Sequence, residues 1–260
     1  MTRMYEVVWI AVLISGAAFH AVSQDAKVQL SPITQIRNGV QAWPLIINPR
    51  NEAERRINRH LAELNTMLSR SLEDCDANYR TAMGDRPKPQ DKDEEGAELW
   101  TQEVKVTMVG PIFLSLVATS EFYCGGAHPY GFTSAAVFDL RTGELADPLK
   151  WFQPSVKVSI SDEGENSAAL EKSLSVPRLL TAYRDATHHE CDDQYPDDQS
   201  FLVWPDERSG KVVIQADRLS GCCEACGIEA GLTMELAREL GFSETFLQSI
   251  ADAHQQSVPR

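Results

Sequence analysis

The chain is poor in basic residues, with 24 Lys and Arg against 38 Asp and Glu, which gives a formal net charge of −14 at pH 7. An acidic surface of this size repels phosphate backbones and anionic lipid headgroups. The composition therefore argues against nucleic acid and anionic membrane as partners. The net negative charge is compatible with a basic partner. Such a charge can also serve only to keep a protein soluble, so it does not identify a ligand.

Local catalytic signatures are absent as well. The sequence has no G-x-S-x-G, no H-E-x-x-H and no phosphate-cradling loop. The acidic runs at 91–95 and 192–198 lack the spacing of an EF-hand calcium loop, and we interpret them as solvated loops. No internal repeat is visible, and no run beyond the N-terminus is long enough to span a bilayer. We expect no catalytic residue, no metal and no cofactor.

An apolar run does occur at the N-terminus, over residues 7–14, with Arg3 before it. Its length is typical of a signal peptide and short for a membrane span. Ala21 and Ser23 supply the small residues that a signal peptidase recognises, so we place cleavage before Gln24. The prediction is a signal peptide over 1–23 and a periplasmic or extracellular location. The alternative is an uncleaved anchor, which would be the only membrane contact.

The chain has an even set of six cysteines. In an exported protein such a set indicates disulfides, here formed by Cys75, Cys124, Cys191, Cys222, Cys223 and Cys226. We expect Cys191 to pair with Cys222 or Cys223 and Cys226 to pair with the other, because a bond between adjacent cysteines strains the peptide. Two alternatives stay open. His188 and His189 beside this cluster would suit zinc in a cytosolic chain, and the C-x-x-C would suit redox work in a thioredoxin-like setting.

Side-chain periodicity predicts the partner of Cys75. Over 51–79 an apolar residue recurs every three or four positions, which is the buried stripe of an amphipathic helix, and Cys75 lies on it. Over 112–124 apolar residues alternate with Ser115, Thr119 and Glu121, so one face of a strand is buried and Cys124 belongs to it. A helix packed on this sheet would bring the two sulfurs together.

The order of elements predicts an α+β fold, an antiparallel sheet with packed helices stabilised by disulfides. We expect further strands around 104–108 and over 130–140, the latter followed by a hairpin turn at Gly143. The remaining elements expected are a helical turn at 147–152, a helix over 167–186 interrupted near Pro177, strands at 201–204 and 211–216, and helices at 233–240 and 245–253. The predicted organisation is 24–98 as an N-terminal extension, helix and charged linker, then 99–260 as the α+β domain.

Two short motifs carry a family resemblance. Residues 123–129 read Tyr-Cys-Gly-Gly-Ala-His-Pro, and residues 138–143 read Phe-Asp-Leu-Arg-Thr-Gly. At this distance they resemble an exported domain family of unknown function, in which a Gly-Gly-Ala-His-Pro turn joins two strands and an Asp-Leu-x-Thr-Gly hairpin follows. That family includes the extracytoplasmic part of lysozyme-sensing anti-sigma factors and the accessory region of certain peptidoglycan deacetylases. Upstream, Pro44 precedes a helix with Arg56-Ile57-Asn58, similar to the Ile-Asn of the domain that usually accompanies this one.

The resemblance implies a non-enzymatic binding or sensing module of the cell envelope, for a basic protein such as lysozyme or for cell-wall glycan. This sequence shows neither a sigma-binding segment nor a deacetylase catalytic domain, so neither activity is implied. The candidate binding residues are Gly125, Gly126, His128 and Tyr130. The two glycines permit backbone angles closed to other residues, and we expect the His128 ring to hold the turn by a hydrogen bond or to contact the ligand. The alternative function is an envelope hydrolase or a thiol redox protein that uses His128 or the Cys222, Cys223 and Cys226 cluster.

Overall fold

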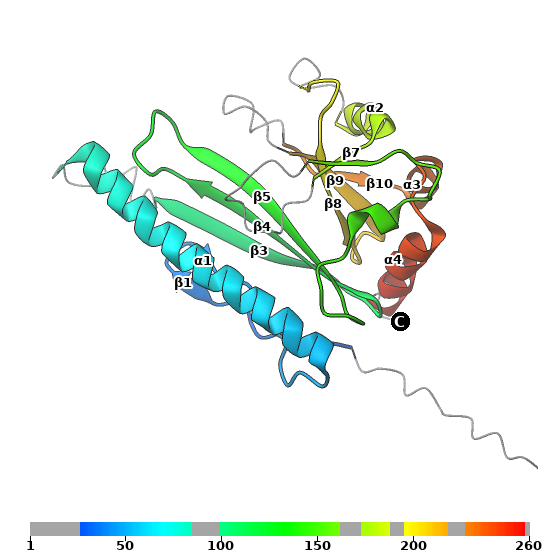
Figure 1. Cartoon of the computed structure of the whole chain (residues 1–260), viewed down its shortest axis with the longest axis horizontal. Helices are drawn as coiled ribbons and strands as arrows, with labels where there is room; N and C mark the ends of the chain where they lie inside the picture. The colour runs from blue at the N-terminus through cyan, green and yellow to red at the C-terminus, as the bar shows by residue number, and fades with distance from the viewer. Residues whose placement is uncertain (1–26, 85–98, 162–172, 188–194, 218–226, 258–260) are drawn as a thin grey trace, which may run out of the picture.

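The computed structural model describes residues 27–84, 99–161, 173–187, 195–217 and 227–257 (Figure 1). It is a mixed α+β structure with two five-stranded, mostly antiparallel sheets and one long helix, so the predicted fold class is confirmed. The predicted signal peptide, most of the predicted linker and four of the six cysteines lie outside the described residues. Within the described residues, no helix combines the length and apolarity needed to cross a membrane. The predicted division at residues 98 and 99 stays a prediction.

The first sheet carries the motif region. Its strands, in spatial order, are β1 (Gln35–Arg37), β2 (Val40–Gln41), β3 (Trp100–Val109), β4 (Phe113–Phe122) and β5 (Tyr130–Asp139). Every pair is antiparallel except β2 with β3. The three long strands contain the alternating runs of the sequence, although β3 begins at Trp100, before the run expected at 104–108, and β5 forms one edge of the sheet. The short strands β1 and β2 were not expected, because two or three residues show no alternation.

Helix α1 (Glu52–Met83) lies along this sheet, as Figure 1 shows. Asn51 caps it, with the side-chain oxygen accepting a hydrogen bond from the backbone N–H of Glu54. The predicted apolar stripe is buried, through Ile57, Leu61, Leu64, Leu68, Leu72, Cys75 and Tyr79. Its first half packs on the inner face of β4, including Leu114 and Leu116. The helix thus follows from the stripe and its cap.

The second sheet has the order β10-β9-β8-β7-β6 and packs on part of the other face of the first, against Met108, Phe113, Val117 and Val137. Its strands are β6 (Ser159–Ser161), β7 (Ser173–Ser175), β8 (Phe201–Asp206), β9 (Lys211–Ala216) and β10 (Ala230–Leu232). Burial of Ser115 and Val117 on β4 corrects the expectation that only one face of this strand is buried. The buried hydroxyl of Ser115 is satisfied, since it accepts a 2.7 Å hydrogen bond from the Thr107 hydroxyl.

The helix expected over 167–186 is wrong in its first part. Residues 173–175 form strand β7, and helix α2 begins only at Pro177 and ends at Ala186. A proline suits the first turn of a helix and holds the residue before it in an extended conformation, as it does Val176. The other expected helices are present as the 3-10 helix η1 (Pro148–Trp151), α3 (Met234–Glu239) and α4 (Glu244–Ser257).

The second motif forms the predicted hairpin turn after β5. Gly143 has φ of +77° and donates its N–H to the Asp139 carbonyl over 2.7 Å. A Cβ at this position would overlap the Ala53 backbone at the start of α1. Glycine is therefore required both by the positive φ and by this close approach. The side-chain hydrogen bond from Arg141 lowers the pKa of the Asp139 carboxyl. The Asp-Leu-Arg-Thr-Gly motif is therefore explained by local structure.

Candidate functional site

The Gly-Gly-Ala-His-Pro turn leaves β4 beside a disulfide bond. Cys75 of α1 is bonded to Cys124, with the Cα atoms 4.7 Å apart. Cys75 is only 2% exposed. The predicted pairing is confirmed, because the buried helix stripe and the inner face of β4 do meet. Next to the bond, the rings of Tyr79 and Tyr123 contact each other edge to face at 6.0 Å.

The two glycines of the turn have different roles. Gly125 has φ of +91°, and a Cβ there would lie 2.6 Å from the Ala82 Cβ and 3.2 Å from the Tyr79 Cα. Gly126 is not among the described residues with positive φ, and the nearest atom to its Cβ would be in the Tyr130 ring at 3.7 Å. The expectation that both positions need glycine is therefore wrong for Gly126. Of the two glycines, only Gly125 is needed for the turn to pack closely against α1.

His128 lies at the exposed tip of the turn. Its Nδ1 is 2.9 Å from the carbonyl oxygen of Pro129, its sequence neighbour, which accepts a hydrogen bond when Nδ1 carries the proton. The ring also packs on Tyr130, with 4.4 Å between ring centroids. A single exposed bond to the adjacent residue does not bridge the turn. Of the two roles expected for His128, the ring does make a hydrogen bond within the turn, although an exposed one, and contact with a ligand stays a prediction.

We therefore expect His128→Ala to leave stability nearly unchanged. The substitution removes a solvent-exposed contact and leaves no buried polar group without a partner, so the free energy of unfolding should fall by at most about 0.5 kcal/mol. Urea denaturation of wild type and variant measures this difference. A loss of about 1 kcal/mol or more would show that the imidazole holds the turn after all.

Tyr130 belongs to a cluster of aromatic side chains at this end of the first sheet, the aromatic patch, which consists of Trp100, Phe122, Tyr130 and Phe132. Phe122 is the direct cross-strand partner of both Trp100 and Tyr130. The Phe122 ring stacks on Trp100 at 4.6 Å and on Tyr130 at 5.9 Å. Phe132 meets the Trp100 and Phe122 rings edge to face. Cross-strand aromatic pairs of this kind stabilise the sheet.

The patch is accessible on the β5 side. Tyr130 is 42% exposed and Phe132 is 38% exposed, whereas Trp100 is 7% exposed. Tyr130 is predicted from the sequence only as part of the motif, and the other residues of the patch are not predicted. The signal was present in the alternation of β5, which puts Phe132 on the same face as Tyr130. Their exposure could not be foreseen, because it depends on where α1 ends its contact with the sheet.

The described surroundings of His128 are the Pro129 carbonyl and the Tyr130 ring. The contacts of His128 include no nucleophile and no carboxylate that would orient the ring. No group of three or more His, Cys, Asp or Glu side chains there is placed to hold a metal ion. The Cys222, Cys223 and Cys226 cluster and the nearby histidines lie outside the described residues, so the predicted pairings stay predictions.

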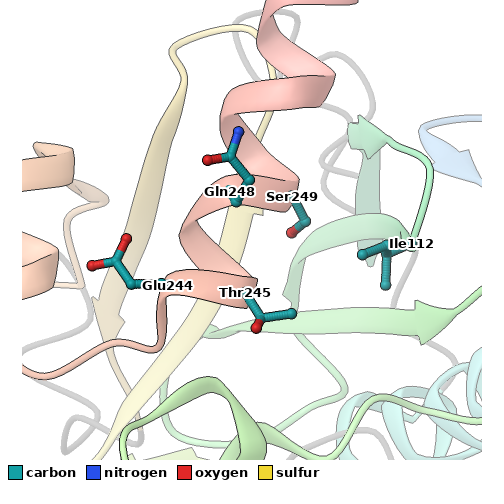
Figure 2. Close-up of a pocket in the computed structure, with 5 residues that line it drawn as sticks. All are labelled: Ile112, Glu244, Thr245, Gln248 and Ser249. Carbon is teal, nitrogen blue, oxygen red and sulfur yellow. The ribbon is translucent and has the colours of Figure 1, made fainter.

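A shallow hollow of about 410 Å³ elsewhere on the molecule is the rival location. It lies between the start of β4 and α4 and is lined by Ile112, Glu244, Thr245, Gln248 and Ser249 (Figure 2). Glu244 forms an ion pair with Arg238 and points away from Ile112. Gln248 donates to Asp252, and Ser249 donates to the Phe246 carbonyl. Since these polar groups already have partners within the chain, the hollow offers less to a ligand than the turn does.

Comparison with known proteins gives no further guide to the site: no protein-family model matches the chain, and no curated protein matches it.

Proposed function

We propose that this protein is an exported, non-enzymatic binding or sensing module of the cell envelope, and that it contacts its ligand through the Gly-Gly-Ala-His-Pro turn and the start of β5. The observation that carries the proposal is the exposed, touching pair of His128 and Tyr130 on a turn fixed at its base. Gly125 and the Cys75–Cys124 bond fix that base against α1. Binding residues commonly lie on loops held by a rigid scaffold, because a preformed site loses less conformational entropy on binding.

Two further considerations support an envelope ligand. The motif resembles that of exported domains that sense lysozyme or accompany peptidoglycan deacetylases. A disulfide is consistent with the periplasmic or extracellular location that the proposal requires, because such bonds are rare in reducing compartments. The ligand proposed on this basis is a basic protein such as lysozyme or cell-wall glycan.

The test is capture of these two ligands by the immobilised mature protein. Wild type should retain a basic lysozyme or insoluble peptidoglycan, and the double variant His128→Ala/Tyr130→Ala should retain at least about tenfold less, which corresponds to 1.4 kcal/mol. Leu149→Ala is the matched control, since Leu149 is 44% exposed but lies in η1, outside the turn. Failure to retain either ligand, or equal retention by the double variant, contradicts the proposal.

A further inference from the structure

The turn between β1 and β2 consists of Asn38 and Gly39, the only Asn-Gly pair of the sequence. The two strands are paired up to Arg37 and Val40, so no other residue belongs to the turn. Asn38 is exposed, and Gly39 has φ of +73°, a conformation that residues with a side chain rarely adopt. Asn-Gly is a common sequence for such a turn. The fold accounts for the pair, but it also leaves the two residues in a reactive arrangement.

The reactive groups are the side-chain amide of Asn38 and the backbone nitrogen of Gly39. Attack of this nitrogen on the side-chain amide carbon closes a succinimide ring, and Gly39 has no side chain to hinder the closure. Within the described residues, no hydrogen bond engages the Gly39 N–H, whereas its carbonyl oxygen accepts a 2.9 Å hydrogen bond from the Gln102 N–H. The attacking nitrogen is therefore not held back by the sheet.

The other described asparagines are protected from the same reaction. Asn48 precedes Pro49, whose nitrogen has no hydrogen to lose. The side-chain oxygen of Asn51 is engaged as the cap of α1, where it accepts from the Glu54 N–H. The asparagines within α1 are each followed by a residue whose N–H is bonded in the helix; they are Asn58, Asn65 and Asn78. Asn38 is thus the described asparagine most open to attack by its neighbour.

We propose that Asn38 is a site of spontaneous deamidation, a modification that needs only water and is independent of any bound ligand. The Gly39 nitrogen forms a bond to the side-chain carbon of Asn38 and gives its proton to water. The bond from that carbon to the side-chain nitrogen breaks, and this nitrogen takes a proton from water and leaves as ammonia. Water then opens the succinimide at either carbonyl, which gives aspartate or isoaspartate. Asparagine is among the thermolabile residues for this reason.

Isoaspartate at residue 38 weakens the attachment of the β1–β2 hairpin to the first sheet. Its main chain passes through the side-chain carboxyl and is one carbon longer, so Gly39 and Val40 must shift relative to β3. Val40 is fully buried and pairs with Gln102 of β3. The same shift moves the Gly39 carbonyl away from the Gln102 N–H that it accepts from. The modification therefore acts on the contact between β2 and β3.

The experiment is incubation of the folded mature protein at neutral pH and physiological temperature, followed by peptide mass spectrometry. Asn38 should convert at least about tenfold faster than any other asparagine, because only there does glycine follow and leave the ring closure unhindered. Asn38→Gln, whose longer side chain would have to close a larger ring, should show no conversion over the same period. Conversion at residue 38 in a urea-unfolded sample but not in the folded one would show that the fold protects the turn, and would overturn the proposal.

Hydrogen–deuterium exchange at the Gln102 amide tests the structural consequence. This amide should exchange at least about tenfold faster in the isoaspartate form, separated by ion-exchange chromatography, than in the unmodified protein. Asn38→Asp is the matched control, because it adds the same charge without lengthening the main chain, and it should exchange like wild type. Equal exchange in all three forms would show that the hairpin stays attached and would overturn the inferred effect of the modification.

Discussion

Gly125→Val should lower the free energy of unfolding by about 3 kcal/mol, while Gly126→Val should lower it by about 0.5 kcal/mol. Gly125 has φ of +91°, which a β-branched residue adopts only with strain. Its new side chain would also displace Ala82 and the backbone at Tyr79. Gly126 has neither obstacle, because its Cβ would meet nothing closer than 3.7 Å. Chemical denaturation of both variants beside wild type measures the difference.

The pair of variants is its own control, since the same residue is introduced at two adjacent positions. Equal free energies of unfolding for the two variants, or a larger loss of stability for Gly126→Val, would mean that the turn does not pack against α1 at Gly125. Gly125→Ala should fall between the two, because alanine has the Cβ contact with Ala82 at 2.6 Å but no branched carbon.

Replacing both Cys75 and Cys124 with serine should cost about 2–4 kcal/mol of stability. The bond joins residues 49 apart in sequence, so it removes many conformations from the unfolded chain. The buried position of Cys75 adds a second cost, because a serine hydroxyl there needs a hydrogen-bond partner. The double variant leaves no unpaired thiol from this bond to exchange with the other four cysteines.

The measurement is the midpoint of thermal unfolding, which should fall by about 5–15 °C for a domain of this size. Cys75→Ala/Cys124→Ala is the comparison that separates the two costs, because alanine buries no hydroxyl. An unchanged midpoint in both double variants would show that α1 and the turn are held together without the covalent bond.

The parts of the fold that the sequence predicts are those with long, regular patterns. Helix α1 follows from its stripe and the Asn51 cap, and β4 and β5 follow from alternation along their length. For β3 the alternation at 104–108 predicts only its second half, because the strand begins at Trp100. The Cys75–Cys124 bond follows from the same periodicities, because each cysteine lies on a face that must be buried. These patterns lie within continuous segments of the chain, so the elements can be predicted from a single sequence.

The remaining features depend on how distant segments pack. Strands of two or three residues, such as β2 and β10, exist only because a neighbour pairs with them. Burial of Ser115 depends on the second sheet covering β4. The exposure of His128 at the tip of the turn could not be predicted either, because it depends on how the turn packs against α1 at Gly125. The aromatic patch is exposed for the same kind of reason, as tertiary packing decides which rings of β5 are covered.

Hydrogen–deuterium exchange of the mature protein, with and without saturating peptidoglycan fragments or a basic lysozyme, tests most directly whether the turn is the contact surface. The backbone amides of residues 125–133 should exchange more slowly in the presence of one of these ligands, because a bound ligand would shield the turn and the exposed start of β5. The hairpin at 139–143 serves as an internal reference and should be unaffected. Slower exchange confined to 244–249, beside the hollow on α4, with no change at 125–133, would contradict the account.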